Sequence, residues 1–224
     1  MTDGLIARVI EPLRRDKNVR GVLLTGSRAR GDALPGSDLD LLVLVNSLTG
    51  RSFCFEMVEG TRVERHIRDV VGAKARLLEN PMELYSYLDG YAVYDLDGLL
   101  AELTKIAGNR FGNYRTPVHE KSAIFYWLKS ASLKLNAAIA AGDRQKAGYY
   151  ASTNSWKVLE GFWARNDKPM PPAGAVWAHI SDLRDVPSDF EASLQELFEG
   201  ETLRRAQVML GLTRWLLERE KRRP

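Results

Sequence analysis

The sequence predicts an α/β (α+β) fold, with a mixed sheet and flanking helices first and a C-terminal antiparallel helical bundle after it. Two observations lead to this prediction. Apolar strand-like runs separated by turn residues dominate the first hundred residues, whereas the later residues repeat apolar side chains at helical spacing. Between these regions lies a stretch rich in Gly, Asn and Pro. We therefore expect a domain at 1–108, a linker at 109–117 and a helical domain at 118–224.

Local patterns justify each element of the first domain. Asn80-Pro81 separates two helices, because proline disfavours a helical conformation in the residue before it. Glu59-Gly60 is a tight turn between two strands. The first predicted elements are a helix at 4–16, a strand at 21–25 and, after the Gly-Ser turn, a short helix that ends near Pro35-Gly36. They are followed by strands at 38–45, 53–58 and 61–67, helices at 68–79 and 82–88, a strand at 92–94 and a helix at 98–107. This order gives a mixed sheet with helices packed on it.

The second domain reads as helical throughout. Ile124, Leu128, Ala131 and Leu135 recur at the spacing of one helical face. The predicted helices are 119–141, 144–165, a short one at 176–183, one after Ser188 and one after Gly200. Successive helices joined by short turns form an antiparallel bundle.

Composition excludes several classes of protein. No apolar run approaches the length of a membrane-spanning helix, and the N-terminus lacks the pattern of a signal peptide. The single cysteine, Cys54, excludes an intramolecular disulfide, which fits a reducing, cytoplasmic location. The formal net charge of +3 is too small to argue for a nucleic-acid partner. The sequence leaves a homodimer open.

The most informative motif lies between the first two strands. Gly26-Ser27 forms a tight turn whose backbone N–H groups can approach a phosphate. Asp38 and Asp40 are two residues apart at the start of a strand, so both carboxylates project from one face. Adjacent carboxylates are costly without a cation, and hard oxygen ligands beside a phosphate cradle suit Mg²⁺.

A third carboxylate on a neighbouring strand would complete the site. Glu64 lies in the middle of the strand that returns from the Glu59-Gly60 turn, and we expect it to face the pair. Asp69 is the alternative, although it falls past the end of that strand. Glu59 lies in the turn and is expected to be too far from Asp38 and Asp40.

The Gly-Ser turn followed by the Asp-x-Asp pair resembles the signature of the DNA polymerase beta-like nucleotidyltransferase superfamily. The segment from Gly60 to Glu64 also looks like the corresponding strand of kanamycin nucleotidyltransferase-type antibiotic nucleotidyltransferases. The helical half is similar in layout to the substrate-binding bundle of those enzymes. The resemblance implies a nucleotidyltransferase sheet that moves a nucleoside monophosphate from a nucleoside triphosphate, with ATP the expected donor, to a hydroxyl, releasing pyrophosphate.

The resemblance also implies roles for individual residues. Asp38 and Asp40 would hold two Mg²⁺ ions, with Glu64 completing the site of the ion that activates the hydroxyl. The residues expected to bind the nucleotide are Gly26, Ser27, Arg30 and Ser37. Arg28 is the alternative cation, because two arginines two positions apart on a short helix point in different directions.

The sequence offers no carboxylate at the position expected for the general base. The antibiotic nucleotidyltransferases use a carboxylate on a bundle helix, but in the matching helix here the acid is Glu120, at the first turn. Glu160 on the next helix is the substitute candidate for a catalytic base.

The expected acceptor is a small hydroxylated molecule bound by the helical domain, with no membrane involved. Two other functions stay open. One is a minimal nucleotidyltransferase that modifies a protein partner, as an antitoxin does. The other is a non-catalytic nucleotide-binding protein, against which the complete set of Asp38, Asp40 and Glu64 argues.

Overall fold

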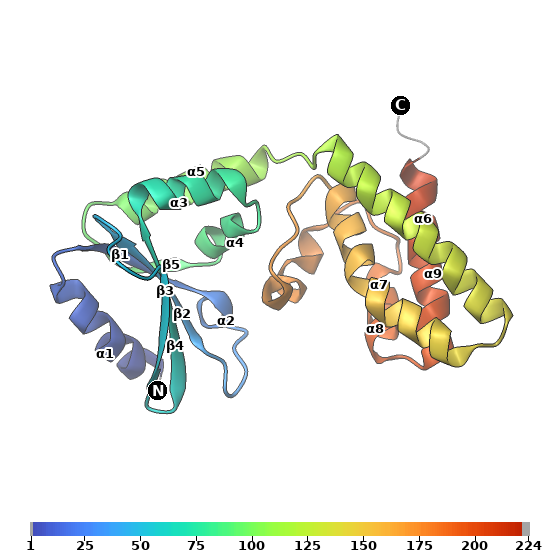
Figure 1. The fold of residues 1–224 in the computed structure, drawn as a ribbon, viewed down its shortest axis with the longest axis horizontal. Helices are drawn as coiled ribbons and strands as arrows, with labels where there is room; N and C mark the ends of the chain where they lie inside the picture. The colour runs from blue at the N-terminus through green and yellow to red at the C-terminus, as the bar shows by residue number, and fades with distance from the viewer. Residues whose placement is uncertain (1, 221–224) are drawn as a thin grey trace. The chain divides into compact units, whose positions relative to one another are not determined.

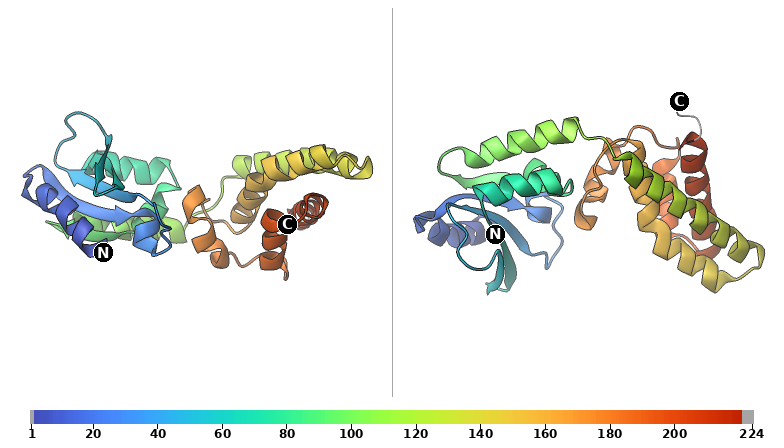
Figure 2. Two further views of the ribbon diagram at one scale, coloured as in Figure 1. Left: turned by 90° about the horizontal axis from the view of Figure 1, so that it is seen from below. Right: turned by 45° about the horizontal axis from the view of Figure 1, so that its top comes forward.

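The computed structural model describes residues 2–220 and contains two compact units, drawn as ribbons in Figures 1 and 2. The first, called the sheet unit here, comprises the chain up to Asn113 together with Pro171–Ile180. The second, the helical unit, comprises Tyr114–Met170 and the described residues from Ser181 onward.

The sheet unit is built on five strands in the order β3-β4-β2-β1-β5. β2 and β4 are parallel, and the other neighbouring strands are antiparallel, so the predicted mixed sheet with flanking helices is confirmed. Its elements are α1 (Thr2–Arg15), β1 (Val19–Thr25), α2 (Gly26–Arg30), β2 (Leu39–Val45), β3 (Phe53–Val58), β4 (Thr61–Asp69), α3 (Val70–Glu79), α4 (Glu83–Leu88), β5 (Tyr91–Asp95) and α5 (Leu99–Gly112).

Both faces of the central strands are buried. On one face, Leu24 and Leu41 belong to a core that includes Val9 of α1. On the other face, Leu42 and Leu44 belong to a core with residues of α3, α4 and α5. Burial on both faces explains why β1 and β2 are apolar at almost every position instead of alternating. Asp40 alternates with Leu42 and Leu44 along β2, so its side chain lies on this second face. The face is therefore polar at the start of β2.

The last helix of the sheet unit, α5, is longer than the helix predicted at 98–107. α5 continues through Gly112, so it includes the first four residues of the expected linker at 109–117. The Phe111 ring packs edge-on against Tyr85 with a centroid distance of 5.4 Å, and Arg110 donates to the Leu78 carbonyl oxygen at 3.1 Å. These tertiary contacts stabilise a helical end whose Gly and Asn residues are weak helix formers.

The described part of the helical unit contains the α-helices α6 (Val118–Ala140), α7 (Arg144–Arg165), α8 (Phe190–Glu199) and α9 (Thr202–Glu220). Their shared interior includes Leu128, Val158, Phe162 and Leu216, each almost fully buried. The predicted helical bundle is therefore present in the C-terminal half. Among the described residues, no helix combines the length and apolar character needed to cross a membrane.

One segment of the C-terminal half belongs to the sheet unit. It contains η1 (Ala173–Ala175) and most of η2 (Trp177–Asp182). Arg30 donates to the Gly174 carbonyl oxygen at 2.8 Å, and the His179 ring lies edge-on to Tyr85. The division predicted from the sequence, with all of 118–224 in one helical domain, differs in this segment because these long-range contacts have no local sequence signal.

Candidate functional site

Asp38, Asp40 and Glu64 meet on one face of the sheet. Asp38 directly precedes β2, and Asp40 is the second residue of that strand. The parallel pairing of β2 with β4 sets Asp40 opposite Glu64, so their side chains point the same way. One ligand oxygen from each of the three carboxylates lies within 4.8 Å of the others.

The other acids considered for the third position are engaged elsewhere. Asp69 ends β4 opposite Val45, and its carboxylate accepts the Gly72 N–H at 2.7 Å as the N-cap of α3. Glu59 lies in the turn and accepts a hydrogen bond from Arg8 at 2.7 Å. Strand register thus places Glu64 beside the aspartates, and neither alternative joins the cluster.

The turn before α2 approaches the carboxylates so closely that it requires glycine. Gly26 has a φ of +70°, a left-handed conformation that side chains rarely adopt. A Cβ atom at this position would lie 2.1 Å from Asp40 Oδ2. Gly26 therefore lets the backbone pass close to the Asp40 carboxylate, and a side chain at this position would clash with it.

The three carboxylates repel one another. Burial raises the pKa of Asp40 to about 6, and the negative charges of Asp38 and Glu64 add to the rise, with Arg30 and Arg28 partly opposing it. A bound divalent cation would reverse this effect by stabilising the ionised carboxylates. Three convergent oxygen donors with a surplus of negative charge fit a hard cation such as Mg²⁺.

A cavity of about 340 Å³ opens beside Asp38 and Asp40. Its wall includes Ser27 and Arg30 from the first predicted motif, and Pro172, Gly174 and Ala175 from the segment that packs on the sheet. The remaining residues that line it are Thr25, Gly26, His66, Tyr85, Ser86 and Asp89.

The two arginines of α2 have different surroundings. Arg28 donates to the carbonyl oxygens of Ser37, at 2.6 Å, and Asp38, at 2.8 Å, and so holds the loop that carries the aspartates. Arg30 reaches the cavity wall, where it donates to Asp32 at 3.1 Å and has a guanidinium nitrogen 3.7 Å from Asp89. Of the two, Arg30 is the cation that faces the cavity.

Ser37 takes part in the same loop. Its hydroxyl oxygen accepts the Leu34 N–H at 2.9 Å, and it is not among the residues that line the cavity. Its predicted contact with the nucleotide thus stays a prediction, while its visible role is to close the turn before Asp38.

Several residues of the cavity were missed by sequence reasoning. His66 follows Glu64 by two positions on β4, so strand alternation alone could have placed it on the same face. Burial lowers the pKa of His66, and the positive charge of Arg68 lowers it further. Asp89 pairs with His179 at 2.9 Å, a contact across ninety positions that no local pattern reveals.

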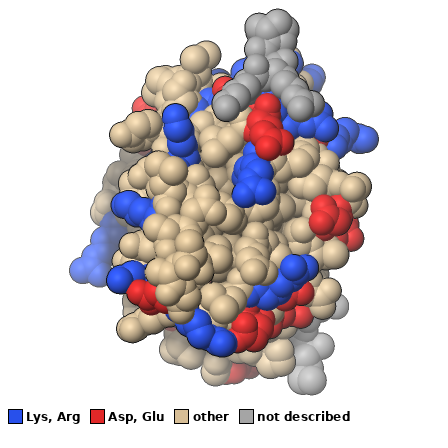
Figure 3. All heavy atoms as spheres, turned by 90° about the vertical axis from the view of Figure 1, so that its right-hand side faces the viewer, with Lys and Arg blue, Asp and Glu red and all other residues tan. Residues whose placement is uncertain are grey.

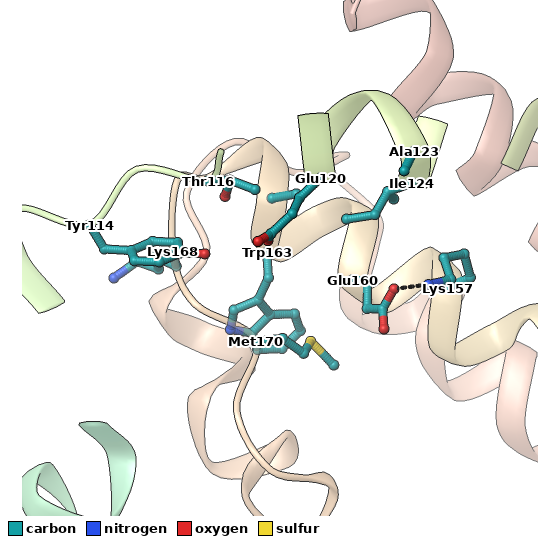
Figure 4. A pocket seen from close by; sticks show the side chains of 11 residues that line it. Tyr114, Thr116, Glu120, Ala123, Ile124, Lys157, Glu160, Trp163, Lys168 and Met170 are labelled. Atoms are coloured by element: carbon teal, nitrogen blue, oxygen red, sulfur yellow. Dashed lines mark hydrogen bonds and ion pairs between the residues drawn. The ribbon is translucent and has the colours of Figure 1, made fainter. Parts of the chain in front are cut away.

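Glu160 lies in a separate cavity of about 310 Å³ within the helical unit (Figure 4). Its carboxylate accepts the Trp156 indole N–H at 2.8 Å and forms an ion pair with Lys157. Glu120 also lines this cavity, as do Trp163 and Met170. The indole nitrogen of Trp163 is buried and has no hydrogen-bond partner among the described residues.

The match to a known family lies within the sheet unit. Residues 6–90 match the family model described as a nucleotidyltransferase domain. No curated protein sequence shows significant similarity to the chain. Among solved structures, a nucleotidyltransferase-like protein from Exiguobacterium sibiricum is similar, with 15% identity, a TM-score of 0.47 and coverage of 98% of this chain and 76% of that one.

Proposed function

We propose that residues 6–90, which match the nucleotidyltransferase domain model, form a catalytic domain of the polymerase beta-like type. We propose that it transfers a nucleoside monophosphate, with AMP from ATP the expected case, to a hydroxyl of a small molecule and releases pyrophosphate. The observation that carries this proposal is the convergence of Asp38, Asp40 and Glu64 within 4.8 Å. A protein that only bound a nucleotide would have no need of the third carboxylate.

The proposed reaction is an in-line displacement at the α-phosphorus. The acceptor oxygen forms a bond to that phosphorus, and the bond from phosphorus to the oxygen bridging to the β-phosphate breaks. The electron pair leaves with pyrophosphate, and the hydroxyl proton passes to a base. Mg²⁺, when bound, supplies Lewis-acid stabilisation of the charge on the phosphate oxygens.

The roles proposed for the chain's residues follow from their positions. Asp38 and Asp40 would hold the two cations, and Glu64 would complete one of the two sites. Ser27 and Arg30 line the cavity next to the aspartates and would bind the outer phosphates there. Glu64 lies one strand further out on β4, so the acceptor hydroxyl would approach from the β4 side.

The helical unit is proposed to bind the acceptor, with Glu160 as the candidate general base. Its cavity is lined by apolar side chains together with polar and charged groups, which a hydroxylated small molecule could contact. The Lys157 ion pair and the Trp156 hydrogen bond hold the Glu160 carboxylate in one orientation. The formal net charge of +3 gives no argument for a nucleic-acid acceptor. On the face drawn in Figure 3, blue and red side chains are interspersed around an uncharged centre and form no broad basic field.

Nucleotide binding is tested first by thermal unfolding. Mg²⁺ with ATP should raise the melting temperature of the wild-type protein, because a ligand that binds only the folded state stabilises it, and EDTA should remove the gain. Asp38→Asn should lose most of the shift. Glu102→Gln, at an exposed carboxylate of α5 paired with Lys74, is the matched control and should keep it. No metal-dependent shift with any of the four common ribonucleoside triphosphates would contradict the proposal.

Transfer itself is tested with ATP carrying label on the α-phosphate and a panel of hydroxylated small molecules that includes aminoglycosides and lincosamides. Label should move to a small molecule with release of pyrophosphate. Transfer only to protein would support the antitoxin-like alternative and contradict the small-molecule acceptor.

A further inference from the structure

β3 presents a row of exposed apolar side chains at the edge of the sheet. Phe53, Phe55 and Met57 alternate along the strand and therefore share one face. Their exposures are 38%, 58% and 63%, and we call these three residues the β3 platform. Large apolar side chains on an edge strand invite aggregation, so a run of three is a feature that needs a function.

Strand register puts the β3 platform on the same face as the carboxylates. Phe55 pairs with Glu64 across the antiparallel β3-β4 ladder, and Glu64 pairs with Asp40 across β4-β2. Paired residues on neighbouring strands point the same way, about 4.8 Å apart in the direction of the hydrogen bonds. Phe55 is therefore the next side chain outward from Glu64, on the side away from the cavity that contains Ser27.

Arg62 connects the β3 platform with the carboxylate cluster. Its guanidinium carbon lies 4.4 Å from the centre of the Phe55 ring, and a guanidinium nitrogen lies 2.7 Å from Glu64 Oε1. Phe53 continues the same surface toward His66, with ring centroids 5.0 Å apart. His66 also lines the cavity beside Asp38 and Asp40. The apolar surface and the catalytic face are thus continuous.

We propose that the β3 platform is the acceptor subsite, where Phe55 supports a planar or apolar ring adjacent to the reacting hydroxyl. The proposal rests on the proposed function, since the triphosphate would occupy the Ser27 side and an in-line attack then needs the hydroxyl on the Glu64 side. Any acceptor must place its hydroxyl near Glu64, whatever part of it the helical unit holds. The acceptor class is a hydroxylated molecule with a ring face, whose oxygens can accept hydrogen bonds from Arg62.

The test uses phenyl β-D-glucopyranoside as the probe, because it carries hydroxyls beside a planar ring. Methyl β-D-glucopyranoside has the same sugar without the ring. Saturation-transfer NMR is carried out with the whole chain, Mg²⁺ and α,β-methylene-ATP. The phenyl protons of the phenyl glucoside should give strong signals, and the methyl protons of the methyl glucoside should give weak ones. In Phe55→Ala the phenyl signals should fall at least fivefold, and Phe55→Tyr should restore them.

Tyr91→Ala is the matched control. Tyr91 is an exposed aromatic residue on β5, the opposite edge strand, and it pairs with Leu24, whose side chain lies on the face that packs against α1. This variant should keep the phenyl signals. Phe55→Ala, Phe55→Tyr and Tyr91→Ala should all keep the melting-temperature shift with Mg²⁺ and ATP. If the wild type itself shows no such shift, the proposed function is rejected, and this result is distinct from a failure of the subsite.

Three results would overturn the subsite. They are absence of phenyl signals with the wild type, undiminished signals in Phe55→Ala, and an equal loss in Tyr91→Ala. Sedimentation provides a further check, since a dimeric wild type that becomes monomeric in Phe55→Ala would assign the β3 platform to contact with a second copy of the chain.

Discussion

Asp40 in the sheet unit and Glu160 in the helical unit are both partly buried acids beside a cavity, but their surroundings are opposite. Asp40 faces two other carboxylates, and burial together with their charges raises its pKa to about 6. Glu160 is held by a lysine and an indole N–H from its own helix. A bound cation would therefore stabilise the ionised form of the first acid, whereas the second already has Lys157 as its counter-ion.

The difference arises from how each cluster is built. Trp156 and Lys157 precede Glu160 by four and three residues, so one turn of helix brings them to it. Asp40 and Glu64 are brought together by strand pairing. Arg62 pairs with Glu64, but Arg30 and Arg28 offset the raised pKa of Asp40 only in part. A local cluster tends to neutralise itself, while a cluster assembled across a sheet can keep uncompensated charge for a ligand to use.

The largest effect should come from removing a carboxylate of the sheet cluster. Asp38→Asn and Asp40→Asn should each lower kcat by roughly a thousandfold or more, because electrostatic stabilisation of the transferring phosphate depends on the bound cations. Label transfer from ATP measures this effect, with Glu102→Gln as the control. Turnover within tenfold of the wild type in either variant would contradict the larger catalytic role assigned to the sheet cluster than to Glu160.

Glu160→Gln should have a smaller effect. If Glu160 is the general base, kcat should fall roughly a hundredfold while the thermal shift with Mg²⁺ and ATP stays unchanged. Glu102→Gln, at an exposed carboxylate that does not line this cavity, is the control and should retain turnover. Unchanged turnover in Glu160→Gln would mean that the hydroxyl loses its proton without a separate base.

Gly26→Ala sharpens the comparison by moving Asp40 without removing its charge. The added methyl group clashes with Asp40 and strains a positive φ, so we expect a loss of about 2 kcal/mol in unfolding free energy and a marked fall in turnover. Gly31→Ala is the control, because φ is +83° there but nothing lies within 4 Å of the new methyl group. It should lose about 1 kcal/mol and keep its activity. Equal turnover in the two variants would contradict the close-approach argument.

The smallest effect concerns stability against pH in the metal-free protein. The folded-state pKa of Asp40, about 6, exceeds its ordinary value of 3.8, so the folded state binds more protons between these values and stability falls as pH rises through this window. Asp40→Asn should therefore be more stable than the wild type above pH 6, on the order of 1 kcal/mol after allowing for solvent screening.

This advantage of Asp40→Asn should shrink toward pH 4, and adding Mg²⁺ should reverse it. Urea unfolding in EDTA across this range measures it. A constant difference from pH 4 to pH 8 would show that charge repulsion is not its cause.

The sequence alone determined those features that depend on neighbours in the chain. The apolar strands, the Gly26-Ser27 turn and the Asp38-x-Asp40 spacing are local, because side-chain alternation and backbone conformation act over a few residues. They were enough to predict the mixed sheet, the helical half and the nucleotidyltransferase domain. Glu64 was ranked first among three acids by its place within a strand.

Only the tertiary structure decided how distant residues meet. Strand register brought Glu64 to Asp40 and set Phe55 beside it, since a shift of one residue would turn every side chain to the other face. Packing of 171–180 on the sheet brought Gly174 to Arg30 and His179 to Asp89. Bringing residues so far apart in sequence together costs chain entropy, and packing across the whole unit must offset that cost. No short stretch of sequence encodes this packing.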